Sequence, residues 1–169
     1  MNPKLAAWNE ADGRTALDAM LACCGAKRWA TEMAASRPIG SFNELSEMAD
    51  RVWSTMQERD WLEAFACHPR IGEHKVSHAG DKSAGWSKQE QSRASSAGEE
   101  VLAELAEGNR LYEQRFGFTY IVCAAGKSAE EMLGILKHRL GMPRDAELRE
   151  AAEQQRQIMQ IRLGKWLTE

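Results

Sequence analysis

The chain has 169 residues, of which 43% are hydrophobic and 28% charged, and its formal net charge is −3 at pH 7. We expect a single domain over residues 1–169 with a sizeable core, since no linker or low-complexity tract divides the chain. Lysine and arginine are scattered among acidic residues, and this distribution argues against a nucleic acid or a membrane as partner.

Most apolar residues recur at helical spacing, and good helix formers such as alanine, glutamate and leucine are abundant. The run from Phe116 to Cys123 is the exception, because its β-branched and aromatic residues suit either a short extended piece or a buried helix. The predicted fold is an all-α, single-domain, multi-helix bundle. Its predicted helices cover residues 3–8, 14–24, 26–36, 42–59, 61–67, 88–106, 108–116, 129–140 and 143–167.

The longest strongly apolar run, Tyr120 to Ala125, is too short to span a bilayer, and Met1 to Trp8 has no apolar core of signal-peptide length. The four cysteines form no C-x-x-C pair and no regular framework, which predicts reduced thiols. We therefore expect a soluble, cytoplasmic protein. The sequence does not determine the oligomeric state, and a homodimer is among the states that it allows.

A histidine stands at the end of the predicted helix 61–67. His68 is followed by Pro69, which restricts the residue before it to extended geometry, so the helix should stop at Cys67 or His68. An imidazole presented at a helix end can act as a general acid or base near neutral pH. The alternative is a histidine that only complements the helix macrodipole.

The segment Ser87-x-x-Glu90-Gln91 begins like a capping box, in which serine and glutamate satisfy the first amides of the predicted helix 88–106. Gln91 beside the glutamate, and a preceding stretch at 72–85 that could cover a pocket, suggest more than a cap. A helix N-terminus also favours an anion, so the segment is a candidate carboxylate-binding point. The same capping signature occurs at Ser41-x-x-Glu44 and Ser128-x-x-Glu131.

Arg162 falls among the apolar positions of the predicted last helix. Such an arginine either extends its charge to solvent or pairs with a carboxylate. If it points inward, its planar guanidinium suits a carboxylate or an imide-like oxygen.

Three histidines could be combined into a metal site, because His74 and His78 have helical ligand spacing and follow His68 by six and ten residues. The residues between them form a poor helix, and no carboxylate or cysteine stands at a supporting spacing. We therefore predict no metal. If one were bound, the chain would be interpreted as a metal-assisted hydrolase of a hydantoin-like ring.

Taken together, several motifs resemble one family, the 2-oxo-4-hydroxy-4-carboxy-5-ureidoimidazoline (OHCU) decarboxylases of purine and urate degradation. The likeness covers nearly the whole chain, in order and with matching intervals. The motifs are His68-Pro69-Arg70-Ile71-Gly72, Ser87-x-x-Glu90-Gln91, Asn109-x-x-Tyr112-x-x-Arg115-Phe116-Gly117-Phe118, and Arg162 in a C-terminal helix.

The resemblance implies an all-α fold, no metal or organic cofactor, and conversion of a small urate-derived ureide into S-allantoin with loss of carbon dioxide. It implies catalytic roles for His68 and Glu90. Many relatives have a different sequence after His-Pro, so the role of Arg70 stays open. The resemblance implies substrate binding by Pro69, Ser87, Gln91, Phe118, Ile121, Val122 and Arg162.

Our hypothesis is that His68, held by Glu90, handles the proton of the substrate hydroxyl, while Arg162, Gln91 and main-chain amides fix the ring and the ureido group. The remaining alternative is a non-catalytic helical binding module. In that case the same motifs are caps, core residues and surface charges.

Overall fold

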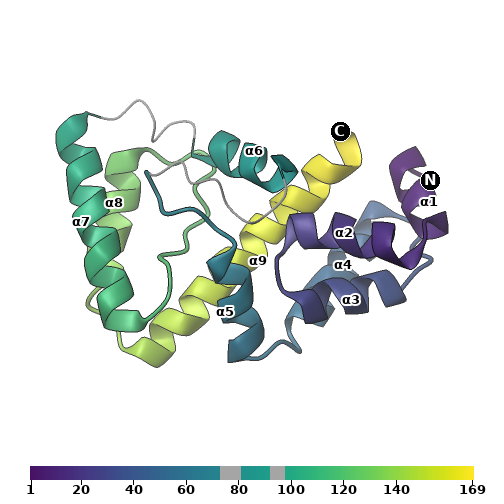
Figure 1. Cartoon of the computed structure of the whole chain (residues 1–169), viewed down its shortest axis with the longest axis horizontal. Coiled ribbons are helices and arrows are strands. Elements are labelled where there is room, and N and C mark those ends of the chain that lie inside the picture. Colours follow the sequence, from purple (N-terminus) through teal and green to yellow (C-terminus); the bar gives the residue numbers. More distant parts are fainter. Residues whose placement is uncertain (73–80, 92–97) are drawn as a thin grey trace. The chain divides into compact units, whose positions relative to one another are not determined.

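The computed structural model describes residues 1–72, 81–91 and 98–169. Over these ranges the chain forms nine α-helices and no β-strand, which confirms the predicted all-α class. The described residues divide into two compact units, one of residues 1–64 and 156–169 and one of residues 65–155. Figure 1 shows the helices α1 Pro3–Glu10, α2 Gly13–Cys23, α3 Lys27–Ala35, α4 Phe42–Trp53, α5 Glu58–Ala66, α6 Asp81–Glu90, α7 Glu99–Phe116, α8 Ala129–Arg139 and α9 Arg144–Thr168.

The first unit has a core rich in tryptophan. Trp8 of α1 and Trp166 of α9 meet edge to face, with ring centroids 5.9 Å apart. Trp29 of α3 is fully buried and donates its indole N–H to the carbonyl of Ala49 in α4, at 3.1 Å. The ring contact joins α1 to α9 and the indole hydrogen bond joins α3 to α4.

Two of the three capping signatures act as caps. The hydroxyl of Ser41 accepts the backbone N–H of Glu44 at 3.2 Å, and the Glu44 carboxylate accepts the N–H of Gly40. Ser128 likewise accepts the N–H of Glu131 at the start of α8. The local signature is sufficient there because both partners lie within one turn.

The predicted helices 42–59 and 61–67 have the wrong boundary between them. Helix α4 ends at Trp53, and α5 begins at Glu58. The Asp60 carboxylate accepts the N–H of Gln57 at 2.9 Å, which starts α5 three residues earlier than predicted. An acidic side chain in the first turn satisfies an amide that the helix itself leaves without an acceptor.

The predicted helices 88–106 and 108–116 are also wrong. Residues 81–90 form α6, so the expected start of a helix at Lys88 lies in the last turn of one. Helix α7 runs unbroken through Gly108, where a Cβ atom would lie 2.6 Å from Leu136 Cδ2. Gly108 therefore allows α7 and α8 to pack closely side by side (Figure 1).

None of the described helices is long and apolar enough to cross a membrane. His74 and His78 lie outside the described residues. In the ranges 1–72, 81–91 and 98–169, no group of three metal-ligating side chains is close enough to hold an ion.

Candidate functional site

His68 lies two residues beyond α5, as predicted from the proline that follows it. Its backbone N–H donates to the carbonyl of Phe65 at 3.1 Å and closes the last turn. The imidazole Nε2 lies 2.7 Å from Oε1 of Gln155 on α9. The Gln155 side chain is fully buried, whereas His68 is only half-buried. The histidine is thus held at one ring nitrogen by an amide that water does not reach.

The turn that follows His68 is attached to two other helices. Ile71 accepts a hydrogen bond from the Asn109 side chain of α7 at 2.9 Å. The N–H of Gly72 donates to Oε1 of Gln91, just beyond α6, also at 2.9 Å. Gly72 has a φ of +86°, a conformation that glycine adopts without strain. The structure therefore brings together two segments that the sequence singled out separately.

The side chain of Arg70 lies on the same turn and forms a two-pronged ion pair with Glu113 of α7. Its Nε and Nη2 donate to the two carboxylate oxygens at 2.7 and 2.8 Å. A fork of this kind restricts orientation as well as distance. Arg70 is therefore a second attachment of the His68 turn to α7.

Ser87 and Glu90 lie in the last turn of α6, so the predicted capping box at the start of a helix is wrong. The carbonyl of Ser87 accepts the N–H of Gln91 at 3.2 Å, which is the hydrogen bond that closes the last turn of a helix. Ser87 and Gln91 are buried and Glu90 is half-buried. The expected anion site at a helix N-terminus is wrong for the same reason, because the C-terminal end of a helix repels an anion.

Phe118 begins a buried segment between α7 and α8 that is neither helix nor strand, which excludes the buried helix that periodicity left open for these residues. Its ring packs 5.5 Å from that of Phe65 and 5.7 Å from that of Tyr112, centroid to centroid. Gly117 turns the chain out of α7 with a φ of +82°. Phe118 thereby lies against Phe65, near the end of α5.

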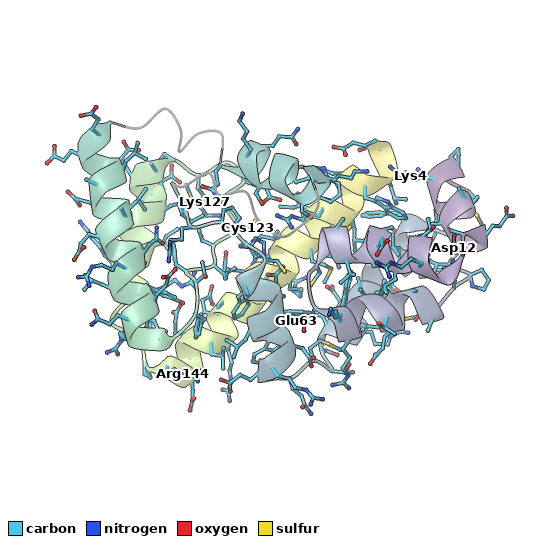
Figure 2. The ribbon with its side chains drawn as sticks, in the orientation of Figure 1. Lys4, Asp12, Glu63, Cys123, Lys127 and Arg144 are labelled. Carbon is cyan, nitrogen blue, oxygen red and sulfur yellow. The ribbon has the colours of Figure 1, made fainter. Side chains whose placement is uncertain are left out.

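The rest of this segment is held through its backbone. The carbonyl of Cys123 accepts a hydrogen bond from the Lys127 ammonium at 2.7 Å; both residues are labelled in Figure 2. The N–H of Cys123 donates to Gln154 Oε1 at 2.8 Å. Ile121 and Val122, two expected binding residues, are buried. Side chains and backbone are thus both immobilised by neighbours.

A buried charged cluster supports the same segment. Glu147 of α9 is fully buried and accepts hydrogen bonds from Tyr112 and from the Arg139 Nε of α8. Arg139 also donates to the carbonyl of Ile121 at 2.5 Å. Burial, and the hydrogen bond to Glu147, raise the pKa of Tyr112 well above its usual value, so the phenol stays protonated as a donor. The Asn109–Phe118 motif is therefore largely a scaffold.

Arg162 is 5% exposed and lies on α9 seven residues beyond Gln155, within the first unit. This burial excludes the alternative in which Arg162 extends its charge to solvent. Gln155 is the residue that sequence analysis missed, although a signal was present. Like Arg162, it is a polar residue in the buried stripe of α9 that includes Ala151, Ala152, Ile158 and Met159.

Residues 9–164 match the family model of OHCU decarboxylase. The chain is 38% identical over 144 residues to the "uric acid degradation bifunctional protein TTL" of Arabidopsis thaliana, covering 85% of this chain and 44% of that protein. It is 29% identical over 127 residues to the 2-oxo-4-hydroxy-4-carboxy-5-ureidoimidazoline decarboxylase of Amia calva, covering 75% and 73% of the two.

A crystal structure of OHCU decarboxylase in the presence of (S)-allantoin superimposes with a TM-score of 0.78 at 35% identity, over 90% of this chain and 99% of that one. The chain spans less than half the length of the Arabidopsis protein. Sequence and fold agree over almost all of the residues, from the first unit through the second. The chain therefore belongs to the OHCU decarboxylase family.

Proposed function

We propose that this chain is a carboxy-lyase that converts OHCU into S-allantoin and carbon dioxide without a cofactor, as a step of urate degradation. The observation that carries the proposal is the His68 imidazole, presented beyond α5 and held at 2.7 Å by a buried amide, in a chain of this family. A half-buried histidine fixed at one nitrogen is suited to proton transfer at the other.

The reaction needs no external electron sink. The carbon that loses carbon dioxide also bears a hydroxyl, and its neighbour in the ring forms a carbon–nitrogen double bond. The electron pair of the breaking carbon–carbon bond moves toward that ring nitrogen, which takes a proton. The hydroxyl proton then leaves, the carbonyl forms, and a proton is added to the ring carbon that bears the ureido group. The protein has to orient the ring and transfer protons.

In this proposal His68 removes the hydroxyl proton, and the negative charge of Glu90 favours the imidazolium that results. Glu90 is half-buried in the last turn of α6, on the segment whose next residue, Gln91, holds the turn after His68. A carboxylate that stabilises an imidazolium is a recurrent arrangement in proton-transfer sites.

Substrate binding is assigned to a set of largely buried side chains. Phe118 packs on Phe65 near the end of α5, and its aromatic ring suits contact with the face of a substrate ring. For Arg162 the proposal rests on the family resemblance and on its burial. We place its guanidinium against ring oxygens, because a grip on the departing carboxylate, whose charge is lost, would not speed the reaction. The proposed binding residues are Pro69, Ser87, Gln91, Phe118, Ile121, Val122 and Arg162.

Three broader statements belong to the same proposal. Residues 1–169 act as one OHCU decarboxylase-like domain, since the family match crosses both units. The partner is a small ureide, and light scattering on the purified protein will distinguish a homodimer from a monomer. The compartment is the cytoplasm, where the four cysteines would remain the thiols that they are here.

The test is to generate the intermediate from urate with the upstream enzymes and to follow its disappearance by absorbance, with and without this protein. We expect the decay to accelerate in proportion to protein concentration. We expect the rate of decay to be the same after the protein has been dialysed against a strong chelator, whereas a metal-assisted hydrolase would lose activity. An unchanged decay at every protein concentration would instead support a binding module.

A further inference from the structure

Gln155 has a feature that its burial alone does not explain. The side chain is fully buried, and its Oε1 lies 2.7 Å from Nε2 of His68. Its Nε2, however, has no hydrogen-bond acceptor among the described residues. A buried amide with half of its hydrogen bonds unmade is a poor stabilising residue compared with a methionine of similar length. Its presence at this position therefore points to a role at the histidine.

We propose that Gln155 is a positioning residue that holds His68 in the tautomer with the proton on Nε2, so that Nδ1 is the nitrogen that accepts a proton. Gln155 lies outside the set of residues to which the family resemblance assigns roles. Its consequence for turnover rests on the proposed function, but the tautomer itself is a property of the protein without substrate.

The chemistry of the contact determines the direction of the hydrogen bond. A carbonyl oxygen can only accept, so the imidazole nitrogen that faces it has to carry the proton. When the neutral ring has its proton on Nε2, the lone pair is on Nδ1. The amide of Gln155 therefore selects which of the two nitrogens is basic.

The same contact persists through a catalytic cycle in which His68 gains and loses a proton. An imidazolium donates at both nitrogens, and the Gln155 oxygen accepts from it more strongly than from the neutral ring. The opposite amide orientation would place two donors against each other whenever the ring was charged. Only the orientation seen here suits a histidine that acts as a base.

The backbone of α9 fixes the position of this oxygen. Gln155 lies among the buried residues Ala151, Ala152, Ile158 and Met159, one turn to either side. The adjacent Gln154 is itself held between Glu150 and the N–H of Cys123. A glutamine in such surroundings loses little conformational entropy when it binds the histidine, because packing has already restricted it.

The experiment compares the full chain with two variants, Gln155→Met and the matched control Gln157→Met, which makes the same chemical change in a half-buried residue of α9. Proteins labelled with ¹⁵N-histidine are examined by NMR at a pH where the ring is neutral. The resonances of His68 are identified by their loss in His68→Ala, among the four histidines of the chain.

We expect His68 to show a hydrogen-bonded proton on Nε2 in the full chain and in Gln157→Met. In Gln155→Met that proton should exchange with water and its signal should disappear, while thermal unfolding shows a midpoint that is unchanged or higher. In the decarboxylation assay, kcat of Gln155→Met should fall about tenfold or more with KM nearly unchanged, as expected when a base is no longer held in the right tautomer.

A neutral His68 with its proton on Nδ1 in the full chain would overturn the proposal. So would a Gln155→Met protein that retains the Nε2 proton signal, or one that keeps full kcat. A full chain with the expected NMR signature but no activity toward the intermediate would refute the proposed function and leave the tautomer assignment standing. The two failures are therefore distinguishable.

Discussion

At the scale of single residues, the proposed chemistry is concentrated where the chain leaves α5. Pro69 ends the helix and Gly72 supplies the positive φ that turns the chain back toward Gln91. His68 is the one side chain of this turn that can exchange a proton near neutral pH. Substitutions here should therefore separate activity from stability, because His68 is only half-buried and its removal leaves no large cavity.

His68→Ala should lower kcat by about two to four orders of magnitude, the usual range for the loss of a general acid or base. Circular dichroism and the unfolding midpoint should stay close to those of the unchanged protein. His138→Ala, on the last turn of α8, is the matched control and should keep its activity. If His68→Ala retained more than about a tenth of the activity, His68 would have no part in the proton transfer.

Glu90→Gln should reduce activity sharply without loss of stability. The substitution keeps the shape of the side chain and removes the charge that would stabilise a protonated imidazole. Glu90 lies at the C-terminal end of α6, where a negative charge opposes the helix dipole, so its neutralisation should leave the urea midpoint unchanged or slightly higher. Glu104→Gln, an exposed partner of Lys137, serves as control. Unaltered turnover in Glu90→Gln would show that the charge of Glu90 has no part in the mechanism.

At the scale of elements, α7 acts as a frame. Along one helix, Asn109 and Glu113 hold the turn after His68, while Tyr112 reaches Glu147 of α9. Gly108 permits close packing against α8, which carries Arg139 to the same cluster. The spacing of these polar residues by three and four positions puts them on one face of the helix. Helix packing and the geometry of the site are therefore coupled through α7.

Arg139→Met should destabilise the protein strongly. It leaves the fully buried Glu147 with an uncompensated charge and removes the donor to the Ile121 carbonyl, and the loss of one partner of such a pair costs about 3–5 kcal/mol. Urea denaturation measures this change. Arg110→Met is the control: it breaks an exposed ion pair with Glu107 on α7 and should leave the urea midpoint unchanged. Equal midpoints for the two variants would contradict the role given to the buried cluster.

At the scale of the whole molecule, the proposed reaction also proceeds without a catalyst, so the stereochemistry of the product is informative. Uncatalysed decay can be protonated from either face of the ring and should give racemic allantoin. A bound ring exposes one face to a fixed donor. The difference between the two outcomes tests whether the product is formed inside a site.

We expect the product to be optically active, with the S configuration that the family resemblance implies. Circular dichroism recorded before slow racemisation reports this without a rate measurement. The blank reaction should be silent. An optically silent product that forms faster than the blank would mean that the ring leaves before protonation, which contradicts a proton donor held near it.

The sequence by itself determined the all-α class, the end of α5 near His68 and the caps at Ser41 and Ser128. Each of these depends on residues within a few positions of one another, so local chemistry was sufficient. The motifs together also indicated the OHCU decarboxylase family, which the family match confirms.

Only the tertiary structure decided the rest. Helix α6 and the continuity of α7 through Gly108 depend on packing partners far along the chain, and packing overrides the local signals that suggested a cap and a break. The contact of His68 with Gln155 joins residues 87 positions apart. No local pattern predicts such a pairing, because a polar residue in an apolar stripe indicates that a partner is needed but not which distant side chain supplies it.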